Sequence, residues 1–124
     1  MILGLISLGL LGWLMVAAVG RSLESGEWEG FLTFGRGTES FKPCGSREVW
    51  WVRSSGFSTI IDQLKEQYDQ VAATPYDLVF VRISGDVSKK GQFGPLGSYQ
   101  RVVYIKEIHE VRERQDSDCR KRKG

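Results

Sequence analysis

The middle of the chain changes its hydrophobic period, and this change constrains the fold more than any other feature. From Phe57 to Val71 the apolar residues recur at helical spacing and form one stripe. The segments before and after this stretch alternate apolar and polar residues and are rich in β-branched and aromatic side chains, as strands are. A single amphipathic helix is therefore flanked on both sides by β-structure.

Strand-like segments precede and follow the predicted helix. They cover residues 28–35, 40–45, 47–53, 77–84 and 100–114. The last of them should contain a bulge near Glu107, because the alternation of its apolar residues breaks there. A helix between the third and fourth of five strands is the order of the OB fold, a small Greek-key barrel. The sequence thus predicts an all-β, five-stranded OB-like barrel with one α-helix.

The first twenty residues, "MILGLISLGLLGWLMVAAVG", contain no charged side chain. A run of this length is typical of a membrane-spanning helix or of a signal-peptide core. Ala18 and Gly20, or Val16 and Ala18, could occupy the −3 and −1 positions of a signal-peptidase site, yet no Lys or Arg precedes the run. We expect an N-terminal hydrophobic helix at residues 1–20 that acts as a transmembrane anchor, with a cleaved signal segment as the alternative.

The charge distribution bears on domain organisation and partners. The chain holds 17 Lys and Arg against 15 Asp and Glu, and its net charge of +2 comes from the basic C-terminal end. We predict a linker at 21–27, the barrel domain at 28–114 and a basic disordered tail at 115–124. A near-neutral barrel argues against a nucleic-acid partner, because phosphate binding needs clustered Lys and Arg.

The residue types used in catalysis and metal binding are sparse. Cys44 and Cys119 have no CxxC spacing and His109 is the single histidine, so we predict no metal site. Sequence spacing leaves open whether the cysteines form a disulfide, and Cys44 is interpreted as a structural side chain. The stretch "GQFGPLG" lacks the ending of a phosphate-binding loop. We therefore expect no catalytic residues and no cofactor, and hence no enzyme.

The stretch "FKPCGSREVWW" places two tryptophans in succession on a predicted strand. Successive strand side chains point to opposite faces, so one ring enters the core and the other lies outside. The outer ring then packs against the helix, the glycine-rich loop or a ligand. OB folds bind ligands around strands 2 and 3. The candidate ligand or partner surface consists of Phe41, Trp50, Trp51, Phe93 and Tyr99.

Two longer stretches, "GFLTFGRGTESFKPCGSREVWWV" and "VFVRISGDVSKKGQFGPLGSYQRVVYIKEIHEVR", carry a resemblance. Their F-x-P-C-G-x-x-E-x-W-W-V and G-x-x-G-x-x-G-x-Y motifs resemble those of a group of small, mostly uncharacterised bacterial envelope proteins and lipoproteins. The resemblance covers about residues 28–112. It departs at Pro95, where members often have His, and in the lack of a lipid-attachment cysteine. It implies an OB-like domain at the outer face of the cytoplasmic membrane, and no reaction.

These features predict a membrane-anchored, non-enzymatic envelope protein that binds another protein or a polar cell-surface component. The alternative function is an OB module for single-stranded nucleic acid or oligosaccharide, and a redox role of Cys44 is a third. We expect the domain on the extracytoplasmic side. The alternatives are secretion after cleavage and a cytoplasm-facing domain, which the positive-inside rule would favour through Arg21.

Overall fold

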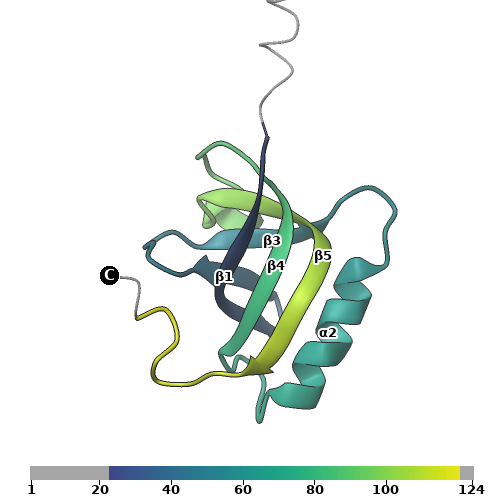
Figure 1. Cartoon of the computed structure of the whole chain (residues 1–124). Helices are drawn as coiled ribbons and strands as arrows, with labels where there is room; N and C mark the ends of the chain where they lie inside the picture. The colour runs from purple at the N-terminus through teal and green to yellow at the C-terminus, as the bar shows by residue number, and fades with distance from the viewer. Residues whose placement is uncertain (1–22, 121–124) are drawn as a thin grey trace, which may run out of the picture.

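The computed structural model describes residues 23–120, and within them five strands close into a barrel (Figure 1). The strands are β1 (Glu24–Gly35), β2 (Thr38–Pro43), β3 (Trp50–Ser54), β4 (Val79–Val87) and β5 (Arg101–Glu113). They follow each other around the barrel in the order β1-β2-β3-β5-β4. The prediction of a five-stranded barrel is confirmed. The hydrophobic helix expected at residues 1–20 lies outside the described residues.

Helix α2 (Ile60–Val71) connects β3 to β4, as predicted, and packs outside the barrel along β5 (Figure 1). It buries Leu64 and Tyr68, and the Tyr68 hydroxyl donates a 2.6 Å hydrogen bond to the Asp77 carbonyl. The stripe assignment of Phe57 was wrong: this residue lies in the preceding loop and is fully exposed. None of the described helices is long and apolar enough to cross a membrane.

Pairing is antiparallel between all neighbouring strands except β3 and β5, which run parallel. Strand β1 pairs with β2 through its second half and with β4 along most of its length. A Cβ added at Gly30 or Gly85 would collide with the backbone of the adjacent strand. Close approach of two backbones at these glycines allows the sheet to bend into a closed barrel.

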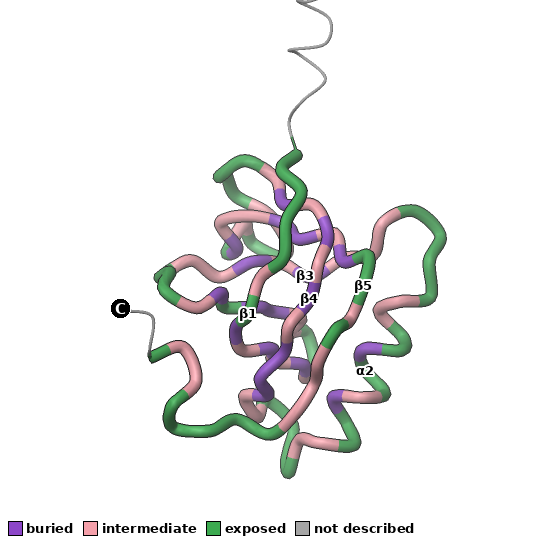
Figure 2. Tube along the Cα trace, in the orientation of Figure 1, coloured by how far each residue is buried: buried purple, intermediate pink, exposed green. Residues whose placement is uncertain are grey.

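The hydrophobic core consists of alternate strand residues and of the buried face of α2 (Figure 2). The fully enclosed side chains include Leu32, Phe41, Val52, Leu64, Tyr68, Val79, Val81, Ile83, Val103 and Ile105. The Trp50 ring lies edge-on to Trp28, with 5.5 Å between the ring centroids. Most of these enclosed side chains are aliphatic, and two further ring contacts, Phe34 with Tyr68 and Phe41 with Trp50, lie in the same core.

Strand β1 is longer than the sequence predicted. Residues 24–27, predicted to belong to a linker, pair with residues 84–87 of β4. They can do so because β4 also continues past its predicted end, to Val87. In β5 the register shifts on both sides of Glu107, so the predicted bulge is confirmed.

Candidate functional site

The structure divides the five predicted surface residues between the core and the exterior. Phe41 and Trp50 face each other on the inner side of the sheet and are 0% and 6% exposed. They are therefore core residues and cannot form a binding surface, which corrects that part of the prediction. Trp51 and Phe93 are half-buried on the exterior, and Tyr99 is buried against Trp51.

Trp51 lies at the centre of a small stack on the outside of β3. The Tyr99 ring is stacked on it, with 6.2 Å between centroids and 18° between planes. The guanidinium carbon of Arg53 lies 4.0 Å from the Trp51 ring centroid, a cation–π contact. A Cβ added at Gly94 would touch both rings, so the loop crosses directly over the stack. The outer tryptophan is thus covered by the glycine-rich loop rather than by α2.

The β4–β5 loop that covers this stack is held by hydrogen bonds. Phe93 and Tyr99 form an antiparallel bridge, with N–H···O distances of 2.9 and 3.1 Å. Gln100 donates its N–H to the Val49 carbonyl at 3.0 Å, and its side-chain oxygen accepts from the Val49 N–H at 2.7 Å. The base of the loop is therefore fixed to the start of β3.

The tip of the loop displays an apolar side chain in a strained conformation. Leu96, within the 3₁₀ turn Pro95–Gly97, has a φ of 59° and is completely exposed. A left-handed backbone at a leucine costs free energy, and so does an isobutyl group in water. Both costs fall on one residue of the loop that covers the Trp51 stack. We call Trp51, Arg53, Phe93, Leu96 and Tyr99 together the Trp51 surface.

Charged groups border the Trp51 surface. Glu39 accepts ion pairs from Arg53 at 3.3 Å and from Lys65 of α2 at 3.1 Å. Arg53 Nε is buried without a hydrogen-bond partner, and no other side-chain polar atom in residues 23–120 shares this state. A buried donor without an acceptor costs about 1–3 kcal/mol.

Two arginines outside the Trp51 surface, Arg101 and Arg82, are already paired. Glu48 accepts hydrogen bonds from Arg101 Nε at 2.7 Å and from Trp50 Nε1 at 2.8 Å. The hydrogen bond from Arg101, followed by that from Trp50, lowers the pKa of the Glu48 carboxyl. Arg82 is paired in the same way with Glu27 at 3.1 Å. The outer face of the barrel consequently alternates in sign and has no continuous basic stripe along β2 and β3.

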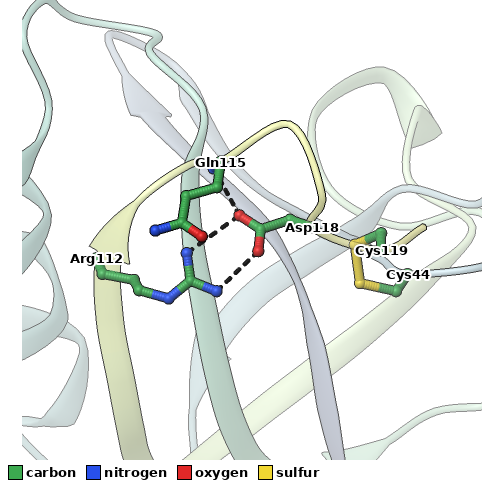
Figure 3. Close-up of a disulfide and its surroundings, with 5 residues drawn as sticks. All are labelled: Cys44, Arg112, Gln115, Asp118 and Cys119. Carbon is green, nitrogen blue, oxygen red and sulfur yellow. Dashed lines mark hydrogen bonds and ion pairs between the residues drawn. A yellow bond between two sulfur atoms is a disulfide. The ribbon is translucent and has the colours of Figure 1, made fainter. Parts of the chain in front are cut away.

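A second cluster closes the opposite side of the barrel. Residues 114–120, which we call the C-terminal strap, follow β5 and turn back toward the barrel. Arg112 of β5 donates two hydrogen bonds, of 2.7 and 3.1 Å, to the Asp118 carboxylate in the strap (Figure 3). The Arg112 guanidinium lies 4.1 Å from the Phe80 ring centroid, and Phe80 is only 4% exposed. The hydrogen bonds from Arg112 lower the pKa of the Asp118 carboxyl. Part of the predicted disordered tail is therefore an ordered cover.

The strap is closed by a disulfide between Cys44 and Cys119, whose Cα atoms are 4.9 Å apart (Figure 3). The backbone N–H of Cys44 donates a 2.8 Å hydrogen bond to the Glu29 carbonyl, which fixes that cysteine beside β1. Neither cysteine is a free thiol in this structure. The structural interpretation of Cys44 agrees with this, whereas a reactive thiolate does not. The sequence contains two cysteines 75 residues apart, but this spacing does not indicate that the fold brings them together.

A cleft of about 500 Å³ lies under the strap, between Phe80, Arg112, Asp118 and Glu29. Its central cation, Arg112, is already paired with Asp118 and with Glu110. The sequence did not predict this cleft, because the strap lies far along the chain from Glu29 of β1 and Phe80 of β4. We interpret it as the space left by a structural closure.

One group of side chains has the composition of a catalytic triad. His109 Nε2 lies 3.1 Å from Ser84 Oγ and 3.6 Å from a Glu107 oxygen. Both neighbours contact the same ring nitrogen, whereas a triad base uses one nitrogen for the nucleophile and the other for the carboxylate. The group is also exposed, so the arrangement favours a surface polar cluster. Within residues 23–120 no cluster of His, Cys, Asp and Glu could hold a metal ion.

Comparisons with protein-family models, with curated protein sequences and with solved structures find no significant match to the chain. Arguments about its function therefore rest on its own residues and geometry.

Proposed function

We propose that the chain is an OB-like, membrane-tethered and non-enzymatic module of the bacterial envelope that binds a protein partner through the Trp51 surface. The position of α2 between β3 and β4 and the strand order support the OB-like assignment. The resemblance of its sequence motifs to those of envelope proteins favours the proposed cellular placement. The observation that carries the binding role is the strained, fully exposed Leu96 in the loop that covers the half-buried Trp51.

The chemistry of the Trp51 surface favours a protein partner over single-stranded nucleic acid. Base stacking needs an open aromatic face, but Trp51 is already in contact with Arg53, Tyr99 and the loop backbone at Gly94. Arg53 is also neutralised by Glu39. An apolar anchor at Leu96, with the charged side chains of Arg53 and Glu39 at its border, matches the anchor-and-rim composition of protein interfaces.

The disulfide supports an extracytoplasmic domain, since such bonds persist in the periplasm and are rare in the cytosol. Alkaline phosphatase, which folds only where disulfides form, tests the placement when fused to the C-terminus. We expect an active fusion. An inactive phosphatase beside an active cytoplasmic reporter would place the barrel inside the cell and contradict the proposed location.

Binding is tested by substitution of Leu96 with Asn, which tolerates a positive φ and removes the apolar group. Full-length protein in detergent captures membrane proteins, and partners identified by mass spectrometry are purified and titrated against each variant. We expect L96N to weaken the affinity for a true partner about tenfold or more, as loss of a central anchor does. The matched control is Phe57→Asn, which removes an equally exposed apolar side chain from another loop.

Equal affinities for L96N, F57N and the unchanged protein would refute the Trp51 surface as the binding site. The alternative function has its own assay, the retardation of single-stranded oligonucleotides by the full-length protein at moderate salt. Retardation that Trp51→Ala abolishes would favour the nucleic-acid module instead.

A further inference from the structure

Very little chain separates the apolar N-terminal run from the barrel. The run ends at Gly20 and β1 begins at Glu24, which already pairs with Val87 of β4. Four Cα steps reach at most about 14 Å when fully extended. If residues 1–20 stay in the bilayer, as the proposed function holds, the end of the barrel where β1 begins cannot move far from the membrane surface.

Strand register shows which loops share that end. Because Val87 pairs with Glu24, the β4–β5 loop starts beside the first residue of β1. Strand β3 ends at Ser54, which pairs with Ile105, and Ile105 pairs with Gly85, two residues before Val87. On the side of the barrel formed by β4 and β5, the β3–α2 loop therefore starts about 7 Å from the position of Val87. Figure 1 shows both loops toward the end at which β1 begins.

The side chains at this end have the composition of a bilayer contact. Phe57 in the β3–α2 loop is fully exposed, and Leu23, just before β1, is 49% exposed. Lys89 and Lys90 at the start of the β4–β5 loop are exposed and make no ion pair within the described residues. Aromatic and aliphatic groups beside lysines suit the membrane interface, where rings enter the headgroup layer and ammonium groups meet anionic lipid.

The opposite end of the barrel differs. Its exposed apolar residue, Tyr76, packs over Gly35, and its hydroxyl donates to the Arg36 carbonyl at 3.0 Å. Contacts within the chain thus account for the position of Tyr76. No such contact accounts for Phe57. An isolated exposed ring is ordinary by itself, but here it lies at the one end that the chain would hold against a membrane.

We propose that Leu23, Phe57, Lys89 and Lys90 form a membrane-facing end that rests on the lipid surface, with Phe57 in the headgroup layer. The inference rests on the proposed anchoring by residues 1–20. We assign lipid rather than protein to this end, because the segment between Gly20 and Glu24 is too short to hold the barrel far from the bilayer.

The test uses the full-length protein in vesicles of phosphatidylcholine and phosphatidylglycerol. A photo-crosslinking amino acid, p-benzoyl-phenylalanine, replaces Phe57 in one variant and Gln70 in another. Gln70 is exposed in the last turn of α2, about 15 Å further along that helix from its start. We expect lipid adducts at position 57 to exceed those at position 70 several-fold by mass spectrometry. Sedimentation with the vesicles after alkaline extraction reports anchoring separately.

Two results would overturn the inference, and they differ in what else they refute. Protein that sediments with the vesicles but gives no excess of lipid adducts at position 57 is anchored with another orientation, so the proposed function stands without this inference. Protein that is extracted by alkali is not anchored, and both fail. A second variant, Lys89→Glu with Lys90→Glu, should reduce adducts at position 57 in vesicles that contain phosphatidylglycerol and leave them unchanged in pure phosphatidylcholine.

Discussion

Two aromatic rings on the outside of the barrel are covered by the same device, with different results. Phe80 lies under Arg112, which is paired with Asp118, and Trp51 lies beside Arg53, which is paired with Glu39. Arg112 makes a two-pronged bond to a carboxylate in a segment that a disulfide closes. Arg53 keeps a buried Nε without a partner, and the loop that covers Trp51 is held by hydrogen bonds and ring stacking, with no covalent closure.

An arginine over an aromatic ring can therefore stabilise the folded state, as at Phe80, or contribute to a binding surface, as we propose at Trp51. At Phe80 all donors are satisfied and the cover is covalently closed, so the cluster contributes to the folded state. At Trp51 one donor is unsatisfied, Glu39 is shared with Lys65, and Leu96 is strained. Strained or unsatisfied groups that lower stability, and that no contact within the chain offsets, are typical of functional sites.

The largest effect on stability is expected from removal of the disulfide, which closes the Arg112 cluster and has no counterpart at the Trp51 surface. Replacement of both Cys44 and Cys119 by Ala should lower the free energy of unfolding by about 2–5 kcal/mol, because the bond closes a long loop and restricts the unfolded chain. Urea unfolding, followed by tryptophan fluorescence, measures the change. A loss below about 1 kcal/mol would show that the strap is dispensable for the folded barrel.

Double-mutant cycles compare the two ion pairs next. We expect a coupling of about 1–2 kcal/mol between Arg112 and Asp118, whose bond is two-pronged and whose carboxylate is nearly enclosed. For Arg53 and Glu39, which are more exposed, about 0.5 kcal/mol or less is expected. Unfolding of the Ala variants gives both values. Equal couplings would remove the distinction between a structural and an available cluster.

The pH dependence of stability should follow the Arg112 cluster. Because the native pKa of Asp118 is lowered, the unfolded state binds the proton more readily, so stability from this carboxylate is complete above its ordinary pKa of 3.8. It is lost as the pH falls through the lowered native pKa. The difference in stability between the unchanged protein and Asp118→Asn should shrink over that range. Asp116→Asn is the control, since Asp116 makes no contact with Arg112.

The smallest effect is expected at Leu96. Leu96→Asn relieves the left-handed backbone and removes an exposed apolar group, so stability should change by less than about 0.5 kcal/mol, toward a higher melting temperature. Thermal unfolding measures it. A clear loss of stability would mean that Leu96 packs within the chain, and the argument that its exposure serves binding would fail.

Several of these features were predictable from local pattern. The order of strands and helix, the bulge near Glu107 and the division of Trp50 and Trp51 between inside and outside all followed from the alternation of side chains. The pattern did not predict that Trp50 is the ring in the core, because alternation alone does not say which face of a strand points inward. The pairing of Trp50 with Phe41 decided it.

The sequence by itself determined the periods, the charge balance and the apolar run, since each depends on residues close along the chain. Only the tertiary structure decided that β1 starts at Glu24, that Phe57 lies outside the helix and that the glycine-rich loop covers Trp51. It also decided that Cys44 meets Cys119, a partner 75 residues away. Such contacts arise only when the barrel closes, because closure brings together segments whose spacing along the chain carries no record of their distance in space.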